Sequence, residues 1–143
     1  MTQMTFTSID YSASTMKAMP IDQDHMVFTQ EHMGIRVVES GKGPFNNLAT
    51  HVALVMYLDK GAYHYHGYET DADKDNDKIV WELWDIPSDG SSKGKGKITW
   101  ATGKFAGIEG TVDFVVDSPK GFPESTSRHI SQEVMKLTLK NPL

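Results

Sequence analysis

One glycine-rich stretch decides the architecture of this chain: Trp100-Ala101-Thr102-Gly103-Lys104-Phe105-Ala106-Gly107-Ile108-Glu109-Gly110-Thr111-Val112-Asp113-Phe114. Before it, lysines at positions 93, 95 and 97 alternate with glycines at 94 and 96. After it, apolar residues at 112, 114 and 116 alternate with their neighbours. A period of two residues is typical of a strand, and glycine permits a sharp turn. The stretch therefore predicts two strands joined by a compact corner.

Strand periodicity continues through most of the remaining chain, and no window of helical length carries a 3.6-residue apolar stripe. Residues 1–24 lack sustained periodicity, so we expect an irregular N-terminal arm there. We expect polar or Gly/Pro-rich loops at 39–44, 71–77, 87–92 and 118–128. The further strands are expected at 25–39, 48–58, 61–70, 79–86 and 130–139.

This pattern predicts an all-β fold with one domain over residues 1–143, either a sandwich or a closed antiparallel β-barrel. The glycines at 94 and 96 favour a single barrel of about eight strands, because small inward residues let strands bend tightly.

Composition limits the partners. The net charge of -5 gives no basic surface for nucleic acid or an anionic membrane. No apolar run approaches the roughly 18 residues that span a bilayer. The chain has no cysteine, which excludes a thiol nucleophile and a cysteine-ligated metal. No signal peptide is visible, so we expect a cytoplasmic protein, with a processed secreted form as the alternative.

The corner and the strand before it carry a family likeness. Gly96-Lys97-Ile98-Thr99-Trp100, followed by Thr102 to Gly110, resembles the glycine-turn pattern of allene-oxide-cyclase-like barrels, of the calycin or dirigent type. Two further segments, Gly43–Asn47 and Thr70–Asp77, resemble parts of small bacterial members. The likeness covers about residues 33–117. At Ala101 and Asn76 the chain departs from the pattern, since members often carry glycine at both positions.

The resemblance implies an eight-stranded antiparallel barrel with a small cavity, assembled as a dimer or trimer. Characterised relatives of this kind are cofactor-free cyclases and isomerases, and dirigent proteins of similar fold steer radical coupling. No catalytic residue is carried over from these relatives, because no motif of a cyclase's catalytic site matches this chain.

His64-Tyr65-His66 is the most suggestive local pattern for chemistry. Residues i and i+2 of a strand share a face, so both imidazoles point the same way. Such a pair serves as acid and base, or binds Zn²⁺ or Fe²⁺ with one or two more ligands. An exposed strand surface is the plain structural alternative.

A hairpin centred on Lys74 would place His66 directly opposite Glu82. A His–Glu pair inside a barrel is a plausible proton-transfer site. We therefore expect catalysis by His66 and Glu82, with His64 and Tyr68 orienting the substrate. We expect Trp84 and His51 to bind the substrate. A salt-bridged surface pair is the alternative for His66 and Glu82.

The acidic series Asp71-x-Asp73-x-Asp75-Asn76-Asp77, with Glu82 twelfth, matches the acid spacing of an EF-hand loop. It lacks the sixth-position glycine and its flanks are strand-like, so a solvated hairpin loop is expected, with weak surface Ca²⁺ binding left open.

The leading hypothesis is a barrel enzyme, an isomerase, cyclase or lyase, that uses no cofactor or metal and acts on a small hydrophobic or aromatic compound. The alternatives are a non-catalytic barrel that binds a hydrophobic ligand, and a metal-dependent enzyme that uses His64 and His66.

Overall fold

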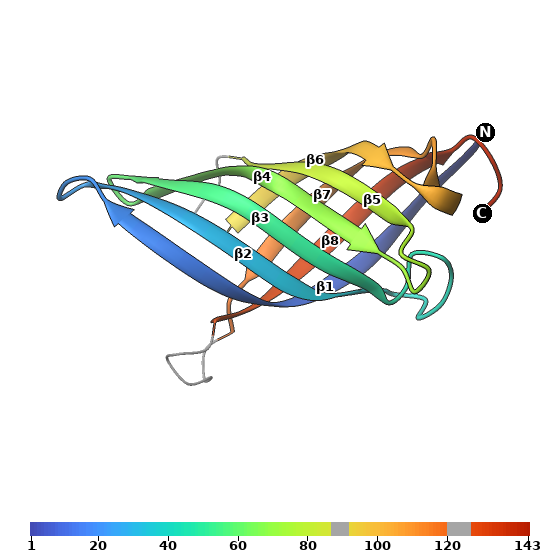
Figure 1. Ribbon diagram of the computed structural model, residues 1–143, viewed down its shortest axis with the longest axis horizontal. Helices are drawn as coiled ribbons and strands as arrows, with labels where there is room; N and C mark the ends of the chain where they lie inside the picture. Colours follow the sequence, from blue (N-terminus) through green and yellow to red (C-terminus); the bar gives the residue numbers. More distant parts are fainter. Residues whose placement is uncertain (87–91, 120–126) are drawn as a thin grey trace.

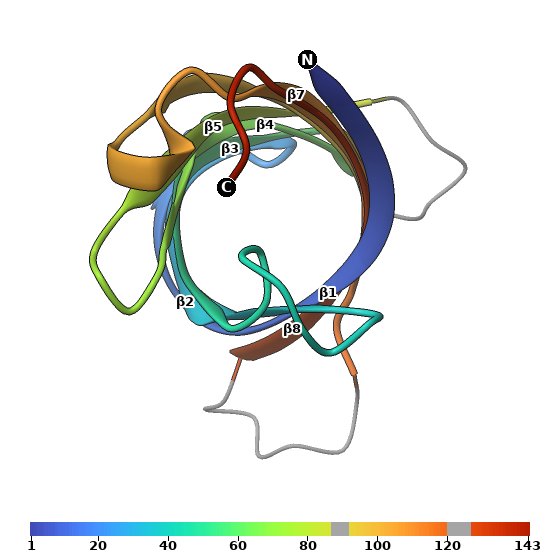
Figure 2. The same cartoon turned by 90° about the vertical axis from the view of Figure 1, so that its right-hand side faces the viewer.

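The computed structural model describes residues 1–86, 92–119 and 127–143. Its strands form a closed antiparallel barrel in sequence order, and the first strand pairs with the last (Figures 1 and 2). This confirms the predicted fold class. The elements are β1 (Thr2–Pro20), β2 (His25–Val38), β3 (Leu48–Asp59), β4 (Ala62–Ala72), β5 (Lys78–Asp85), β6 (Ser92–Ala101), the 3₁₀ turn η1 (Gly103–Phe105), β7 (Glu109–Asp117) and β8 (Ser127–Leu139).

The expectation of an irregular arm over residues 1–24 is wrong. β1 is the longest strand and pairs with both β2 and β8, for example Ser8 with Val38 and Thr2 with Leu139. Its inward positions in mid-strand carry Ser8 and Asp10 instead of apolar residues, so the inward face of the strand is not the apolar one that alternation usually indicates. The loops expected at 87–92 and 118–128 fall mostly on residues 87–91 and 120–126, outside the described part of the chain.

The glycine-rich stretch forms the corner between β6 and β7, as predicted. Gly103 (φ 54°) and Gly107 (φ 81°) adopt the left-handed conformation that favours glycine. A Cβ atom on Gly103 would overlap the carboxylate of Asp77, whose Oδ2 accepts the backbone N–H of Lys104 at 3.1 Å. This corner turns Phe105 and Ile108 into the barrel, where both are buried.

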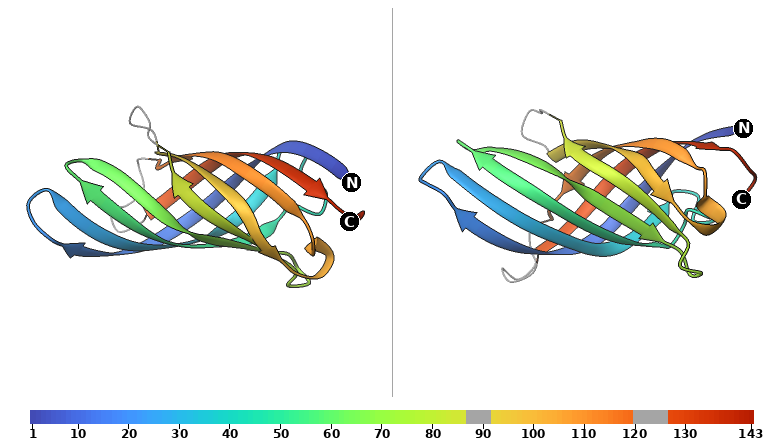
Figure 3. Two further views of the ribbon diagram at one scale, coloured as in Figure 1. Left: turned by 90° about the horizontal axis from the view of Figure 1, so that it is seen from above. Right: turned by 45° about the horizontal axis from the view of Figure 1, so that its top comes forward.

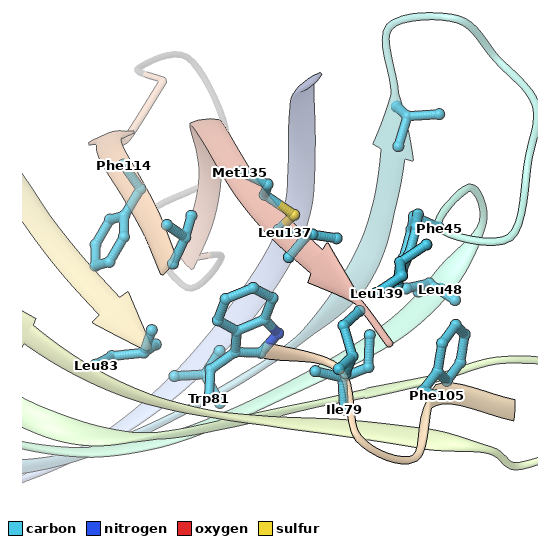
Figure 4. Packing of buried hydrophobic residues seen from close by; sticks show 14 residues of the cluster. Phe45, Leu48, Ile79, Trp81, Leu83, Phe105, Phe114, Met135, Leu137 and Leu139 are labelled. Carbon is cyan, nitrogen blue, oxygen red and sulfur yellow. The ribbon is translucent and has the colours of Figure 1, made fainter. Parts of the chain in front are cut away.

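An apolar plug fills the barrel end beside the chain termini. The Phe105 ring stacks on Phe45 at 5.7 Å, and Phe45 stacks on Phe6 at 5.3 Å between ring centroids. Figure 4 shows the buried residues around Phe45 and Phe105, including Trp81 and Leu137. Phe45 lies on the β2–β3 loop, which crosses this barrel end in Figure 2. The plug therefore closes one end and leaves the other half of the lumen for a cavity.

The alternation of lysine and glycine in β6 has the predicted inside–outside meaning. Gly94 and Gly96 are buried, and a Cβ atom on either would overlap an inward ring or methyl group, of Phe114 or Leu83 respectively. On the outer wall, Lys95 pairs with Asp113 at 3.2 Å and Lys97 pairs with Glu82 at 3.1 Å. No helix in the described part of the chain is long and apolar enough to cross a membrane.

The plug gives a stability prediction. Phe105 is 1% exposed, so Phe105→Ala leaves a cavity and should lower the free energy of unfolding by about 3–5 kcal/mol. Trp100 lies in the same stretch and is 60% exposed, so Trp100→Ala should cost less than about 1 kcal/mol. Denaturant unfolding measures both values. Equal losses for the two variants would contradict the plug.

Candidate functional site

A cavity of about 720 Å³ occupies the barrel half away from the plug. Residues on the long β1–β2 and β3–β4 hairpins line it, among them Met16, Phe28 and Tyr63. Figure 3 shows these hairpins projecting at the end opposite the chain termini. A volume of this size lies within the range of about 300–1,000 Å³ that holds small organic ligands.

The cavity wall has an apolar side and a polar side. The apolar side comes mainly from β3, β5 and β7, and the polar side comes from β1, β2 and β8. The apolar lining includes Val52, Leu54, Met56, Leu83, Val112 and Phe114. The polar lining includes Asp10, Ser12, Gln30, His32, His129 and Ser131. An apolar pocket with a few converging polar groups is typical of a small-molecule site.

A buried ion cluster separates the cavity from the plug. The Arg36 guanidinium donates from Nε to Glu133 Oε2 at 2.7 Å and also donates to Glu69 and Asp71. The Trp81 indole donates to Asp71 Oδ2 at 2.7 Å. Burial disfavours the charged form of Arg36, but the three carboxylates outweigh this and raise its pKa further above the ordinary value. Arg36 therefore stays charged.

One guanidinium does not neutralise three carboxyl groups. Burial raises the pKa of Glu69, and the neighbouring Asp71 and Glu133 raise it further against the opposing effect of Arg36. Burial also raises the pKa of Asp71, while Arg36 opposes that change. Glu69 and Asp71 repel each other when both are charged, so protonation of one of them favours the ionised form of the other.

Asp10 lies at the edge of this cluster without belonging to it. It is 5% exposed and lines the cavity, and its Oδ2 has no hydrogen-bond partner among the described residues. Burial, and then the charge of Glu69, raise the pKa of Asp10 to about 6. The nearby Thr50 hydroxyl and Arg36 lower it by less, and Thr50 Oγ1 also lacks a partner of acceptable geometry in the described chain. Asp10 therefore titrates close to neutral pH.

Two histidines face the same cavity beside Asp10. The rings of His32 and His129 lie 4.6 Å apart, and His129 Nε2 is 2.8 Å from Ser14 Oγ. Burial, followed by the charge of His129, lowers the pKa of His32 to about 4, and burial also lowers the pKa of His129. His32 Nε2 has no hydrogen-bond partner within the described ranges. Both imidazoles are therefore neutral at neutral pH.

The sequence-predicted pair His66 and Glu82 lies on the outer wall. Its side chains are 56% and 24% exposed, and His66 Nε2 is 3.0 Å from Glu82 Oε1. The predicted register is wrong by two residues, because Tyr68 is opposite Glu82 and His66 is opposite Trp84. The pair therefore meets diagonally and not directly across the ladder. The expectation that it lies in the lumen is also wrong, while its catalytic role stays a prediction.

The other expected site residues also point outward. His64 contacts Asp85 at 3.1 Å, and His51 contacts Glu31 at 2.7 Å. Tyr68 and Trp84 share the outer face of the β4–β5 hairpin. His64 and His66 pair with different carboxylates, and no group of three or more His, Asp or Glu residues in the described ranges has an arrangement that could hold a metal ion.

The acidic loop between β4 and β5 is a hairpin loop, as expected. Asp73 Oδ1 accepts the backbone N–H groups of Asp75 at 2.8 Å and Asp77 at 2.9 Å, and Lys104 pairs with Asp73. Asp71 is turned inward to Arg36, and Glu82 points out of the barrel. These two acids therefore lie away from the loop. Calcium binding there stays untested.

Sequence reasoning missed Asp10, His32, Arg36 and His129 as functional candidates. One signal for Asp10 was present, since Ser8, Asp10 and Ser12 alternate with Ile9 and Tyr11. That alternation is typical of a strand with one buried face, although the polar residues of such a strand ordinarily face solvent. His32, Arg36 and His129 become recognisable as lumen residues only when the pairing of their strands is known.

The comparisons with known proteins support the barrel. No protein-family profile matches the sequence, and no curated protein matches it significantly. Among solved structures, the pterocarpan synthase dirigent protein GePTS1 matches with a TM-score of 0.53 and 10% sequence identity. The match covers 100% of this chain and 90% of that chain. At this identity, the likeness shows a shared fold.

Asp10 gives a pH-dependent stability prediction. Its raised pKa means that the folded chain holds this proton more tightly than the unfolded chain, so stability falls as pH rises from about 4 to about 6. Asp10→Asn removes that loss and should stabilise the protein by on the order of 2 kcal/mol at pH 7.5, with little difference below about pH 4. Denaturant unfolding across this range measures the difference.

Asp113→Asn is the matched control, because Asp113 is an exposed carboxylate on the outer wall. Its effect should stay within about 0.5 kcal/mol at each pH. A pH-independent effect of Asp10→Asn would contradict the shifted pKa.

Proposed function

We propose that the barrel lumen binds a small hydrophobic or aromatic compound and transfers a proton to or from it, with Asp10 as the acid–base group. One observation carries this proposal. A buried carboxyl group with a pKa of about 6 and an unpartnered Oδ2 lines a largely apolar cavity. A base of this kind is matched to proton transfer near neutral pH. The apolar wall supplies desolvation and restrains the ligand.

The reaction class is an isomerisation, cyclisation or lyase-type step of the kind that moves a proton at carbon or oxygen. Asp10 in its ionised form would accept the proton, and its protonated form would return it. The neutral His32 and His129 face the same space and supply hydrogen-bond partners for a polar group of the ligand. A non-catalytic binding barrel is the second candidate, favoured by the extent of the apolar wall.

The structural likeness supports a small-molecule role. The matching structure is named as a pterocarpan synthase dirigent protein, and it shares the barrel fold at low identity. The glycine-turn resemblance to allene-oxide-cyclase-like barrels belongs to the same proposal, as does a cytoplasmic location. A homo-oligomer is also proposed, supported by exposed apolar residues on the outer wall such as Met33, Ile35 and Val55.

Ligand binding in the lumen is tested with N-phenyl-1-naphthylamine, an apolar dye whose fluorescence rises in apolar surroundings. The wild-type protein should bind it with one saturable site. Leu54→Trp fills the cavity from β3 and should weaken binding about tenfold or more. Val55→Trp, on the outer face of the same strand, should leave the affinity unchanged. Equal effects of the two variants, or no saturable binding, would reject the lumen as the site.

Acid–base chemistry is tested with 2-tetralone in heavy water, because a general base speeds exchange of its α-protons. NMR should show faster exchange with wild-type protein, and Asp10→Asn should lower the added rate about 100-fold. Glu82→Gln should retain the wild-type rate, since its carboxylate lies on the outer wall. If Glu82→Gln loses the added exchange rate and Asp10→Asn keeps it, the His66–Glu82 pair and not Asp10 is the acid–base group. Dye binding without exchange in any variant would favour the non-catalytic barrel.

A further inference from the structure

Carboxyl groups outnumber cationic groups around the cavity. Its lining includes the acids Asp10, Glu69, Asp85 and Glu133, and Asp71 forms an ion pair with Arg36. In the described lining, the cationic side chains are Arg36 and Lys93, and the two histidines are neutral. Arg36 already forms ion pairs with Glu69, Asp71 and Glu133. The ion pairs of Arg36 are therefore with these three acids, and Arg36 acts on Asp10 only through its charge.

Asp10 is the acid in this cavity lining that has a buried carboxylate oxygen without a hydrogen-bond donor in the described chain. Asp85 differs, because its Oδ1 accepts the Tyr65 backbone N–H at 2.9 Å and its Oδ2 is 3.1 Å from His64. The Oδ2 of Asp10 is buried and lacks any such donor within the described ranges. A buried unpaired carboxylate is costly, and a bound cation that donates a hydrogen bond to it would offset that cost.

The aromatic rings of the cavity also favour a cationic ligand. Two pairs of aromatic rings line the cavity, Phe28 with Tyr63 and Tyr65 with Phe114. In each pair the ring centroids lie 6.4 Å apart. Ring faces attract organic cations, and the attraction grows when water is excluded. The same carboxyl excess would repel an anionic ligand.

We propose that the lumen selects hydrophobic amines in their protonated form, with the ammonium group donating to the carboxylate of Asp10 and the apolar part lying against the rings of the cavity. This inference rests on the proposed function, since it names the ligand class of that same cavity. It requires ionised Asp10, which is also the form that base catalysis requires. A neutral alcohol would supply a hydrogen bond to Asp10 but no compensating charge.

Isothermal titration calorimetry with 2-(1-naphthyl)ethylamine and 2-(1-naphthyl)ethanol at pH 7.5 tests this inference, because the two probes differ only in the polar group. The amine should bind about tenfold or more tightly than the alcohol, and it should displace N-phenyl-1-naphthylamine. In Asp10→Asn the preference should fall to about twofold or less. Asp113→Asn removes an outer-wall carboxylate instead and should keep the full preference.

The preference should also disappear as pH falls below about 6, where Asp10 takes up a proton. The charged and polar groups facing Asp10 from the other strands are Arg36 on β2, Thr50 on β3, Glu69 on β4 and Glu133 on β8. Arg36 stays charged at every pH used, whereas Glu69 and Asp71 also have raised pKa values and can take up protons as pH falls. Asp10→Asn keeps both of these acids, so a pH dependence of the preference that is present in the wild type and absent in Asp10→Asn assigns the midpoint to Asp10.

The outcomes separate this inference from the proposed function. If both probes bind in the lumen with equal affinity, the lumen still takes hydrophobic ligands and the amine inference is overturned. A preference that persists in Asp10→Asn overturns it as well, because the cation then lies elsewhere. If neither probe nor the dye binds, the proposed function and this inference both fail.

Discussion

The ion cluster of Arg36 is the interaction on which the rest of the structure depends. One buried guanidinium joins β2 to β4 through Glu69 and Asp71, and to β8 through Glu133. The strands that it connects lie on different sides of the barrel wall, so the cluster fixes the lumen from within. On one side of it lies the apolar plug, and on the other lies the cavity with Asp10. Breaking such a buried cluster typically costs about 3–5 kcal/mol, because carboxylates are left unpaired.

Periodicity in the sequence predicts most of the strands, because side-chain alternation directly reports which residues face the core. It predicts β3, whose inward positions are mostly apolar, the end of β8, where Met135, Leu137 and Leu139 face inward, and the β6–β7 corner, whose glycines are required by the backbone. Register is harder to predict. The β4–β5 hairpin pairs two residues away from the symmetric arrangement, and a shift by two keeps each residue on its face. His66 and Glu82 therefore still meet, although on the outer wall.

The candidate site escaped prediction for a related reason. Asp10, Arg36 and Glu133 are charged residues far apart in the chain, and a charged residue in a strand is ordinarily assigned to the solvent face. Only the closure of β1 against β2 and β8 brings them together in the barrel interior. The shifted pKa of Asp10 arises from that burial and from Glu69, so local sequence gives no sign of it. The fold was accessible from local patterns, whereas the site depends on long-range pairing.

The apolar plug also makes the two ends of the lumen different. Phe45 and Phe105 close the barrel end beside the chain termini, so the proposed ligand would enter the cavity from the side of the long hairpins. Asp10 lies deep along that path, next to the Arg36 cluster. A ligand bound as proposed would enter polar group first and leave by reversing its path, and its apolar tail would lie nearest the open end of the cavity. The depth of the cavity would then limit the length of the apolar tail. The Arg36 cluster would limit the size of substituents at the polar end.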